Sequence, residues 1–406
     1  QRMKLYLTPY LLLTDPETGR MYPELSSMLA TRRMACSNPN AQQLAKRGES
    51  TYVRGFYLPD AEEEVMVSLD WSQVELVEIG EFSGDPEFAK AYGQLPYQDL
   101  HLGTAADVLA VAIPEVTFDM MKNMHNMKAE DLPPKLLVKP NGELLTPSNA
   151  KKFWRTEVGK GSNFNYWYSG ALSTVGDKLG WKSSQMWEAT ERYRARFPVA
   201  EQWRVNTIEQ ARWDGKVTLP DHHTRVRYEA TYEWINITQR MFDAYQSPAI
   251  TRFGNEIVRA IKNRAGNQLI NALIQGTSAT LAKRSILAIR AALAANPDIR
   301  GRFKMAIHDE LVFSIHKEDV VAFIALAKAI MADHPTIVKN LKLYSTASIG
   351  LTFEPFHETK VPLGQIELDE APACLGFGDG VALNDNQINE TIAYLFNKRT
   401  EMRKAA

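Results

Sequence analysis

The stretch VMVSLDWSQVELVEIGEFSGD, residues 65–85, decides the fold. Its first five residues, 65–69, are a short apolar run typical of a buried β-strand. After Asp70 the pattern changes, because apolar residues recur among acidic ones between 74 and 79, as in a helix. A strand is therefore expected to lead into a helix, with Asp70 at the junction. Rigid backbone there can project a carboxylate into a cleft, and a helix N-cap is the alternative role.

A second β pattern lies in FKMAIHDELVFSIH, residues 303–316, which predicts two strands around a tight turn at His308 and Asp309. Adjacent acids in such a turn, here Asp309 and Glu310, are usually solvated. Together with Asp70, however, they place carboxylates from distant parts of the chain at strand ends. Mg²⁺ binds through oxygen ligands, commonly one or two carboxylates plus substrate phosphate oxygens. The pattern therefore fits a two-metal centre for phosphoryl transfer.

The segment RTEVGKGSNFNYWYSG, residues 155–170, combines a cation with aromatic residues. If it is helical, Lys160, Phe164 and Tyr168 lie on one face, because they are four residues apart. An ammonium beside stacking rings suits the phosphates and base of a nucleotide. A core-packing aromatic stripe with a surface lysine is the alternative.

Two amides four residues apart, Asn271 and Gln275, share a face of another expected helix. They can hydrogen-bond bases or sugars, although amides on helix surfaces are commonplace.

Length and composition restrict the class of protein. A chain of 406 residues suggests two or three domains of roughly 150 residues. A net charge of -1 provides no overall electrostatic signature of nucleic-acid binding, so any anion site must be local. The two cysteines cannot form a disulfide framework. The apolar runs are too short to span a membrane, and no signal peptide is recognised, so a cytoplasmic protein is expected.

Taken in order, these segments resemble the polymerase half of family A DNA polymerases, the group of bacterial DNA polymerase I and many phage replicases. Residues 69–85 resemble motif A, residues 160–170 motif B and residues 305–313 motif C. MLATRRMACSNPNAQQL (28–44) resembles the family's template-primer segment, and DLHLGTAADVL (99–109) its nucleotide-site segment. The resemblance also implies that the protein acts in the cytoplasm of a bacterium or of a phage-infected host cell.

The resemblance implies an α+β fold, the right-hand polymerase arrangement of an antiparallel palm sheet with helical fingers. Residues 1–80 would hold the end of the thumb and the first palm segment. Residues 81–262 would form the fingers, with a Pro-rich, loop-rich insertion at about 113–150. Residues 263–359 would complete the palm, and residues 360–406 would be a C-terminal extension, either a docking helix or a surface helix. The remaining thumb and any exonuclease domain are expected elsewhere in the parent polypeptide or on a second chain.

The implied reaction is template-directed addition of a deoxynucleotide from a dNTP to a primer 3′-OH, with release of pyrophosphate. Asp70 and Asp309 would bind two Mg²⁺ ions, for which Mn²⁺ can substitute, with Glu310 as an auxiliary carboxylate. The implied nucleotide site consists of Gln73, Glu75, His101, Lys160, Phe164 and Tyr168. Glu75 would be the steric gate against a ribose 2′-OH, and Lys160, a catalytic residue, would contact the triphosphate together with His101. Primer-template DNA would be held by Arg33, Asn40, Gln42, Asn271, Gln275 and His308.

Several positions depart from the family pattern. The family has an Arg four residues before the motif B Lys, but Thr156 stands there, and Arg155 is one residue earlier. On a regular α-helix Arg155 would lie about 140° from Lys160, off the nucleotide face. Asn165, Trp71, Val77 and Asn267 also replace the customary residues. Two other functions stay open: a single-subunit RNA polymerase, against which Glu75 argues, and a non-catalytic DNA-binding or assembly subunit derived from a polymerase.

Overall fold

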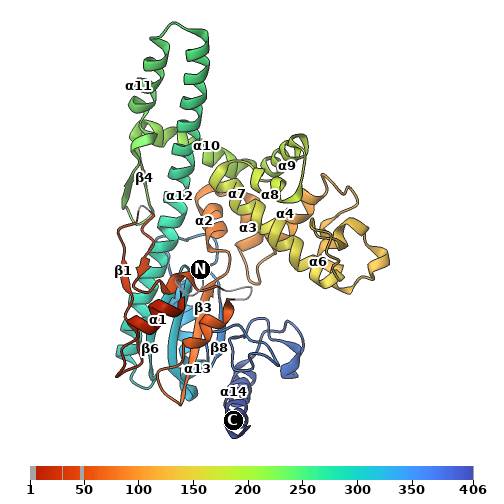
Figure 1. The fold of residues 1–406 in the computed structure, drawn as a ribbon, viewed down its shortest axis with the longest axis vertical. Coiled ribbons are helices and arrows are strands. Elements are labelled where there is room, and N and C mark those ends of the chain that lie inside the picture. Colours follow the sequence, from red (N-terminus) through yellow and green to blue (C-terminus); the bar gives the residue numbers. More distant parts are fainter. Residues whose placement is uncertain (1–5, 30, 46–49, 406) are drawn as a thin grey trace. The chain divides into compact units, whose positions relative to one another are not determined.

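The computed structural model describes residues 6–29, 31–45 and 50–405, which form two compact units (Figure 1). Unit 1 combines three stretches of chain, Gln1–Glu75, Gln275–Val338 and Leu343–Ala406. Unit 2 consists of Leu76–Ile274 and Lys339–Lys342. Two helices run across the boundaries between the units, α2 (Val74–Ser83) and α12 (Pro248–Ala295).

Unit 1 is built on a five-stranded sheet in the order β6-β7-β3-β8-β9, with every neighbouring pair antiparallel. Its strands are β3 (Glu64–Trp71), β6 (Gly301–Ile307), β7 (Glu310–His316), β8 (Ser345–Gly350) and β9 (Ile366–Glu367). The expected strand after residue 64 and the expected hairpin around residues 308–309 are both confirmed. The α+β class with an antiparallel sheet is confirmed as well.

The remaining elements of unit 1 surround this sheet. They are the helices α1 (Thr8–Leu13), α13 (Val320–Ala332) and α14 (Asp385–Ala405), and the hairpin of β1 (Glu24–Ser26) with β2 (Ala35–Ser37). Helix α13 packs on β3, β7 and β8, and α14 packs on α13 and β8. The expected C-terminal extension therefore ends in a helix that buries Ile392 and Leu395 within its own unit.

The central strand β3 is covered on both faces, which explains its continuous apolar sequence. On one face Met66 joins a buried cluster with Val312 and Phe353. On the other face Trp71 donates a hydrogen bond from its indole Nε1 to the carbonyl of Met331 in α13, at 3.1 Å. Because side chains alternate along a strand, Asp70 lies on the face of Met66.

Unit 2 is mainly helical. Besides α2 and α12, its helices are α3 (Pro86–Tyr92), α4 (Leu100–Leu109), α5 (Phe118–Asn123), α6 (Pro147–Trp154), the π-helix η7 (Arg155–Lys160), α7 (Gly161–Ser169), α8 (Ser173–Leu179), α9 (Ser183–Arg196), α10 (Pro198–Asp214) and α11 (Tyr232–Asp243). A small hairpin pairs β4 (Lys216–Thr218) with β5 (Thr224–Val226). The Pro-rich segment 113–150 is less irregular than expected, because it contains α5 and short 3₁₀ turns.

Aromatic side chains form the core of unit 2. Phe88 and Phe197 lie with ring centroids 5.0 Å apart, and Trp167 and Tyr193 lie 6.0 Å apart. All four are almost fully buried. Farther along the unit, α11 runs beside the first part of α12 (Figure 1). Within the described ranges, no helix is long and apolar enough to cross a membrane.

The sheet core makes a direct stability prediction. Phe313 on β7 is fully buried between Phe303 and Phe323, at centroid distances of 5.5 and 4.8 Å. Phe313→Ala should lower the free energy of unfolding by about 3–5 kcal/mol, because it removes apolar burial and leaves a cavity. Leu287→Ala, at a residue that is 66% exposed, should change it by less than about 0.5 kcal/mol. Urea denaturation of both variants would contradict the proposed packing if the two losses were equal.

Candidate active site

Three carboxylates gather at one end of the unit 1 sheet. Asp70 on β3 stands directly opposite Glu310 on β7 in the strand register. Directly opposed residues of an antiparallel pair project from the same face. Asp309 precedes Glu310 in the turn that joins β6 to β7. The pairing therefore brings together acids that are about 240 residues apart in the sequence.

A buried arginine accompanies these carboxylates. Arg54 is 3% exposed, and its Nη1 lies 3.8 Å from Oε2 of Glu310, which is itself buried. The same guanidinium donates hydrogen bonds to the carbonyls of Leu44 and Ala45, both at 3.1 Å. Burial lowers the pKa of Arg54, and the negative charges of Glu310 and Asp70 oppose that shift. A buried carboxylate needs a compensating charge, and Arg54 places one beside Glu310.

Sequence reasoning missed Arg54. It lies in a short 3₁₀ turn (Thr51–Phe56), where nothing in its neighbours distinguishes it from a surface arginine. Only the folded chain places it against Glu310.

Five residues expected at the site line a single small cavity of about 30 Å³: Arg33, Gln42, Glu75, His308 and Asp309. Such a volume holds about one water molecule. Within its wall, Nη2 of Arg33 lies 2.7 Å from Oε1 of Glu75. Asn40 joins Arg33, Gln42 and His308 along a neighbouring surface hollow. Gln73 is half-buried just before α2, and Gln275 is half-buried on α12.

The backbone around this cavity has unusual conformations. Arg32, Gln73 and His308 have φ values of +61°, +55° and +58°. Residues other than glycine rarely adopt positive φ, because Cβ then approaches the carbonyl oxygen. Conformations of this kind cluster at functional sites, where the surrounding structure maintains them. They form an independent indication of a site, one that the sequence does not show.

In unit 2, the cation and aromatic residues expected on one face are indeed neighbours. Nζ of Lys160 lies 5.6 Å from the ring centre of Phe164, and the rings of Phe164 and Tyr168 are stacked at 6.4 Å. Neither aromatic side chain is fully buried, whereas Tyr166 and Trp167 on the same helix are. The core stripe of this helix is therefore formed by Tyr166 and Trp167, whereas Phe164 and Tyr168 are only half-buried.

The expectation that Arg155 lies off this face is wrong, because it assumed a regular α-helix. Residues 155–160 form a π-helix, in which hydrogen bonds join residues five apart. Residues i and i+5 then lie nearly above one another, so Arg155 and Lys160 are on the same side. In the structure Nε of Arg155 lies 2.6 Å from Oδ2 of Asp99, at the N-terminus of α4.

His101 is buried in a hydrogen-bonded cluster. Nδ2 of Asn163 lies 2.8 Å from Nδ1 of His101, while Oδ1 of Asn163 accepts hydrogen bonds from Tyr193 and Thr104. This arrangement orients the Asn163 amide so that its NH₂ donates to Nδ1 of His101, which leaves the ring proton on Nε2. Burial, helped by the charges of Arg155 and Lys160, lowers the pKa of His101 to about 3. The ring is therefore neutral at pH 7 and offers a hydrogen bond rather than a positive charge.

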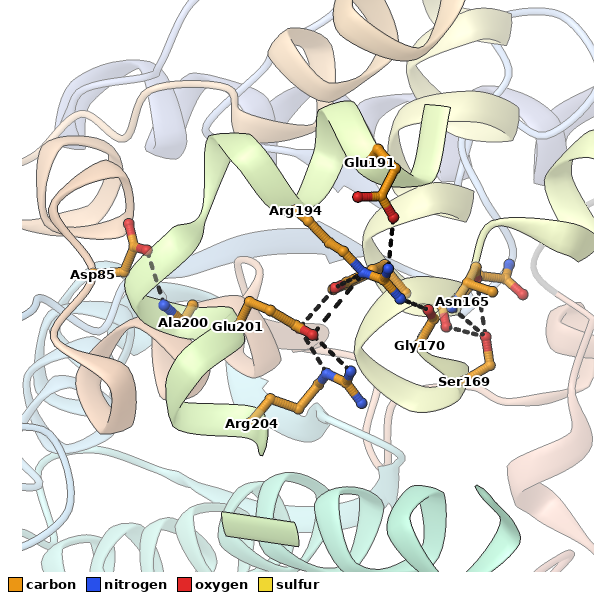
Figure 2. Close-up of polar contacts among 11 residues, drawn as sticks. Asp85, Asn165, Ser169, Gly170, Glu191, Arg194, Ala200, Glu201 and Arg204 are labelled. Carbon is orange, nitrogen blue, oxygen red and sulfur yellow. Dashed lines mark hydrogen bonds and ion pairs between the residues drawn. The ribbon is translucent and has the colours of Figure 1, made fainter. Parts of the chain in front are cut away.

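Figure 2 shows the polar network that supports helix α7 from α9 and α10. Arg204 forms two hydrogen bonds of 2.8 Å to Glu201, whose Oε2 also accepts from Tyr166 at 2.7 Å. Arg194 reaches the hydroxyl of Tyr166 and the carbonyl of Gly170. Burial raises the pKa of Glu201, but the hydrogen bonds from Arg204 and Tyr166 outweigh it and lower the pKa overall. This network fixes the helix on which Phe164 and Tyr168 stand.

Asn271, the last of the expected residues, is half-buried on α12, and its Oδ1 atom is shielded from solvent. Within the described part of the chain, no three His, Cys, Asp or Glu side chains cluster closely enough to form a metal cage. Two carboxylates, completed by water and phosphate oxygens, are nevertheless a usual ligand set for Mg²⁺. Asp70 and Asp309 fit that chemistry.

Comparison with known proteins agrees with this geometry. The profile of DNA polymerase family A matches residues 1–128 and 146–354, well over half of the chain. The chain therefore belongs to DNA polymerase family A, and the predicted resemblance to that family is confirmed.

Individual relatives are distant and longer. DNA polymerase I of Geobacillus stearothermophilus is 23% identical over 340 residues, covering 83% of this chain and 32% of the relative. The thermostable DNA polymerase I of Thermus aquaticus is 24% identical over 329 residues, covering 80% and 32%. The chain thus spans about a third of the length of these relatives. The POL domain of Pol1 from M. smegmatis, solved with DNA primer-template and dNTP, shares the fold with a TM-score of 0.63 and 18% identity, covering 87% of this chain and 51% of that one.

The packing of the π-helix makes a prediction with a matched control. A Cβ on Gly159 would collide with the carbonyl oxygen of His101 in α4. Gly159→Ala should therefore destabilise unit 2 by about 1–3 kcal/mol, although alanine has the better helix propensity. At Gly161 a Cβ would meet Val175 at 3.4 Å and the carbonyl oxygen of Thr156 at 4.0 Å, both ordinary contacts. Gly161→Ala should leave stability unchanged or raise it by up to about 1 kcal/mol. Equal effects in thermal melts would contradict this packing.

The buried neutral His101 makes a pH prediction. Its folded pKa of about 3 lies below the ordinary value of 6.5, so between these limits only the unfolded chain takes up the proton. The free energy of unfolding should therefore fall as the pH is lowered below 6.5, with a contribution of up to about 1.4 kcal/mol per pH unit. His101→Gln should remove this contribution between pH 6.5 and 5. Urea denaturation of both proteins across that range measures it, and identical slopes would contradict the assignment.

Proposed function

We propose that this chain contains the catalytic region of a template-directed DNA polymerase, which adds deoxynucleotides to a primer 3′-OH and releases pyrophosphate. The main support is the register that puts Asp70 opposite Glu310, with Asp309 in the adjoining turn. Carboxylates converging from separate strands fit phosphoryl transfer, which requires chiefly positioning and charge stabilisation from the protein. Membership of DNA polymerase family A agrees with this chemistry.

The proposal includes two Mg²⁺ ions held by Asp70 and Asp309. The two ions would neutralise charge on the attacking and leaving oxygens of the displacement. The protein's own contribution at this end of the sheet is to hold the two aspartates on rigid backbone and to keep Glu310 beside them. Arg54 offsets the negative charge of Glu310, which reduces the repulsion among the carboxylates.

Unit 2 would supply nucleotide contacts. Lys160 is exposed, and its ammonium lies beside the ring of Phe164, a combination that suits a phosphate next to a base. Arg155 adds a second cation on the same side of the π-helix. His101 would act through hydrogen bonds rather than charge. Tyr168, stacked on Phe164, would limit where a base can lie.

Unit 1 and α12 would contact primer-template DNA through Arg33, Asn40, Gln42, His308, Gln275 and Asn271. With a net charge of -1, the chain should bind duplex DNA weakly and with strong salt dependence, because phosphate contacts by Lys and Arg provide most of the affinity. A further part of the polymerase, on the same polypeptide or on a second chain, would supply the remaining contacts with duplex DNA.

A single substitution tests the proposed activity. Asp309→Asn should reduce primer extension by about 10²-fold or more, the order expected when a transition-state stabilising group is lost. DNA binding, measured by fluorescence anisotropy, should stay within about twofold, because Asn keeps the size of the side chain. The control is Asp298→Asn, at an exposed residue of the same unit, which should extend primers normally.

The same assay separates the rival functions. Extension by dNTPs but not by rNTPs supports a DNA polymerase, and the opposite preference would indicate an RNA polymerase. If neither Mg²⁺ nor Mn²⁺ supports extension by the protein in its complete polypeptide or assembly, the chain is a non-catalytic DNA-binding subunit and the proposal is wrong.

A further inference from the structure

The ion pair between Arg33 and Glu75 joins two parts of unit 1 that are distant in sequence. Nη2 of Arg33 lies 2.7 Å from Oε1 of Glu75, with the side chains 34% and 13% exposed. Charge-assisted bonds of this length are among the stronger hydrogen bonds in proteins. Both side chains line the cavity that Asp309 also lines. The pair therefore sets the position of a carboxylate in the wall of the candidate active site.

The chain around Arg33 is held in place by α12. The guanidinium of Arg32 donates from Nη1 to Oγ1 of Thr280 at 3.0 Å, and Nζ of Lys283 donates to the carbonyl of Arg32 at 2.6 Å. Arg32 itself has the left-handed backbone conformation, with φ of +61°. Because this conformation is costly for an arginine, surrounding contacts must maintain it, and those with α12 act together with a turn hydrogen bond of 2.9 Å from the Arg32 N–H to the carbonyl of Leu29. They determine the direction in which the next residue, Arg33, leaves the backbone.

Glu75 benefits from such a partner. A glutamate side chain has three rotatable bonds, and fixing it costs conformational entropy. An unpaired Glu75 at the start of α2 would sample several rotamers, and its carboxylate would not mark a constant boundary of the cavity. The ion pair selects one position. To exclude a single hydroxyl group, the carboxylate of Glu75 must be held in one position, because a small displacement would open space for an oxygen atom.

We propose that Arg33 is a positioning residue for Glu75, and that their ion pair sets the discrimination between deoxyribonucleotides and ribonucleotides. This inference rests on the proposed polymerase function and on the expected role of Glu75 at the sugar. Arg33 thus acts on the nucleotide substrate through Glu75, in addition to its expected contact with DNA. The pair Arg300–Asp319, at 2.8 Å on the same unit but away from the cavity, has similar chemistry and no such role.

The test is a double-mutant cycle with Arg33→Gln, Glu75→Gln and the combined variant. For each protein, in its complete polypeptide or assembly, kcat/KM is measured with dCTP and with CTP on one primer-template. The ratio of the two values cancels any loss of DNA binding, since both substrates use the same DNA. Each single variant should lower the ratio by about tenfold, equivalent to about 1.4 kcal/mol. The combined variant should be no worse than either single one, because both remove the same ion pair.

Two further variants sharpen the test. Glu75→Ala should lower the ratio more than Glu75→Gln, because it removes the bulk of the side chain as well as its position. Arg33→Lys, which keeps the positive charge, should retain much of the discrimination. If Arg33→Gln fails to fold by circular dichroism, Arg33→Met, which also removes the charge, takes its place and should lower the ratio in the same way. Arg300→Gln should leave the ratio as in the unsubstituted protein.

The outcomes are distinguishable. An active enzyme whose ratio is unchanged by Arg33→Gln, or whose two single effects multiply in the combined variant, overturns the inference while the polymerase function stands. A protein that extends primers with neither substrate overturns the proposed function, and the inference with it.

Discussion

The register of β3 against β7 is the constraint on which the rest of the site depends. It sets Asp70 opposite Glu310 and leaves Asp309 in the adjoining turn. If the pairing of β3 shifted by one residue, Asp70 would point to the opposite face of the sheet, the one covered by α13, since side chains alternate along a strand. The register is held because both faces of β3 are covered, by Met66 and its cluster on one side and by the Trp71 contact with α13 on the other. Core packing therefore determines where the acids lie.

Charge compensation is the second requirement of this arrangement. Acids placed together repel one another, and burial of Glu310 adds a desolvation cost. Arg54 forms an ion pair with Glu310, and Arg33 forms one with Glu75. Each arginine lies in a segment outside the sheet. In unit 2, Arg204 and Arg194 play the corresponding part around Glu201 and Tyr166, where they hold α7 in place. The side chains that stabilise these functional elements are thus largely arginines paired with acids.

Much of the fold could be predicted from the sequence. The strand ending at Asp70, the hairpin at 308–309 and the face shared by Lys160, Phe164 and Tyr168 all follow from local periodicity. Arg155 was placed wrongly, because residues 155–160 form a π-helix, which has no simple sequence signature. Arg54 was missed for a similar reason. Its significance comes from Glu310, which is more than 250 residues away in the chain.

The sequence by itself determined the types of element, the order of the motifs and the family, because hydrophobic period and residue chemistry are properties of neighbouring residues. Only the tertiary structure decided which charged side chains form ion pairs, that His101 is buried, and which residues other than glycine have positive φ. The physical reason is that ion pairs, burial and strain are relations between segments distant along the chain. They arise only when the segments pack together, so the local sequence pattern does not predict them.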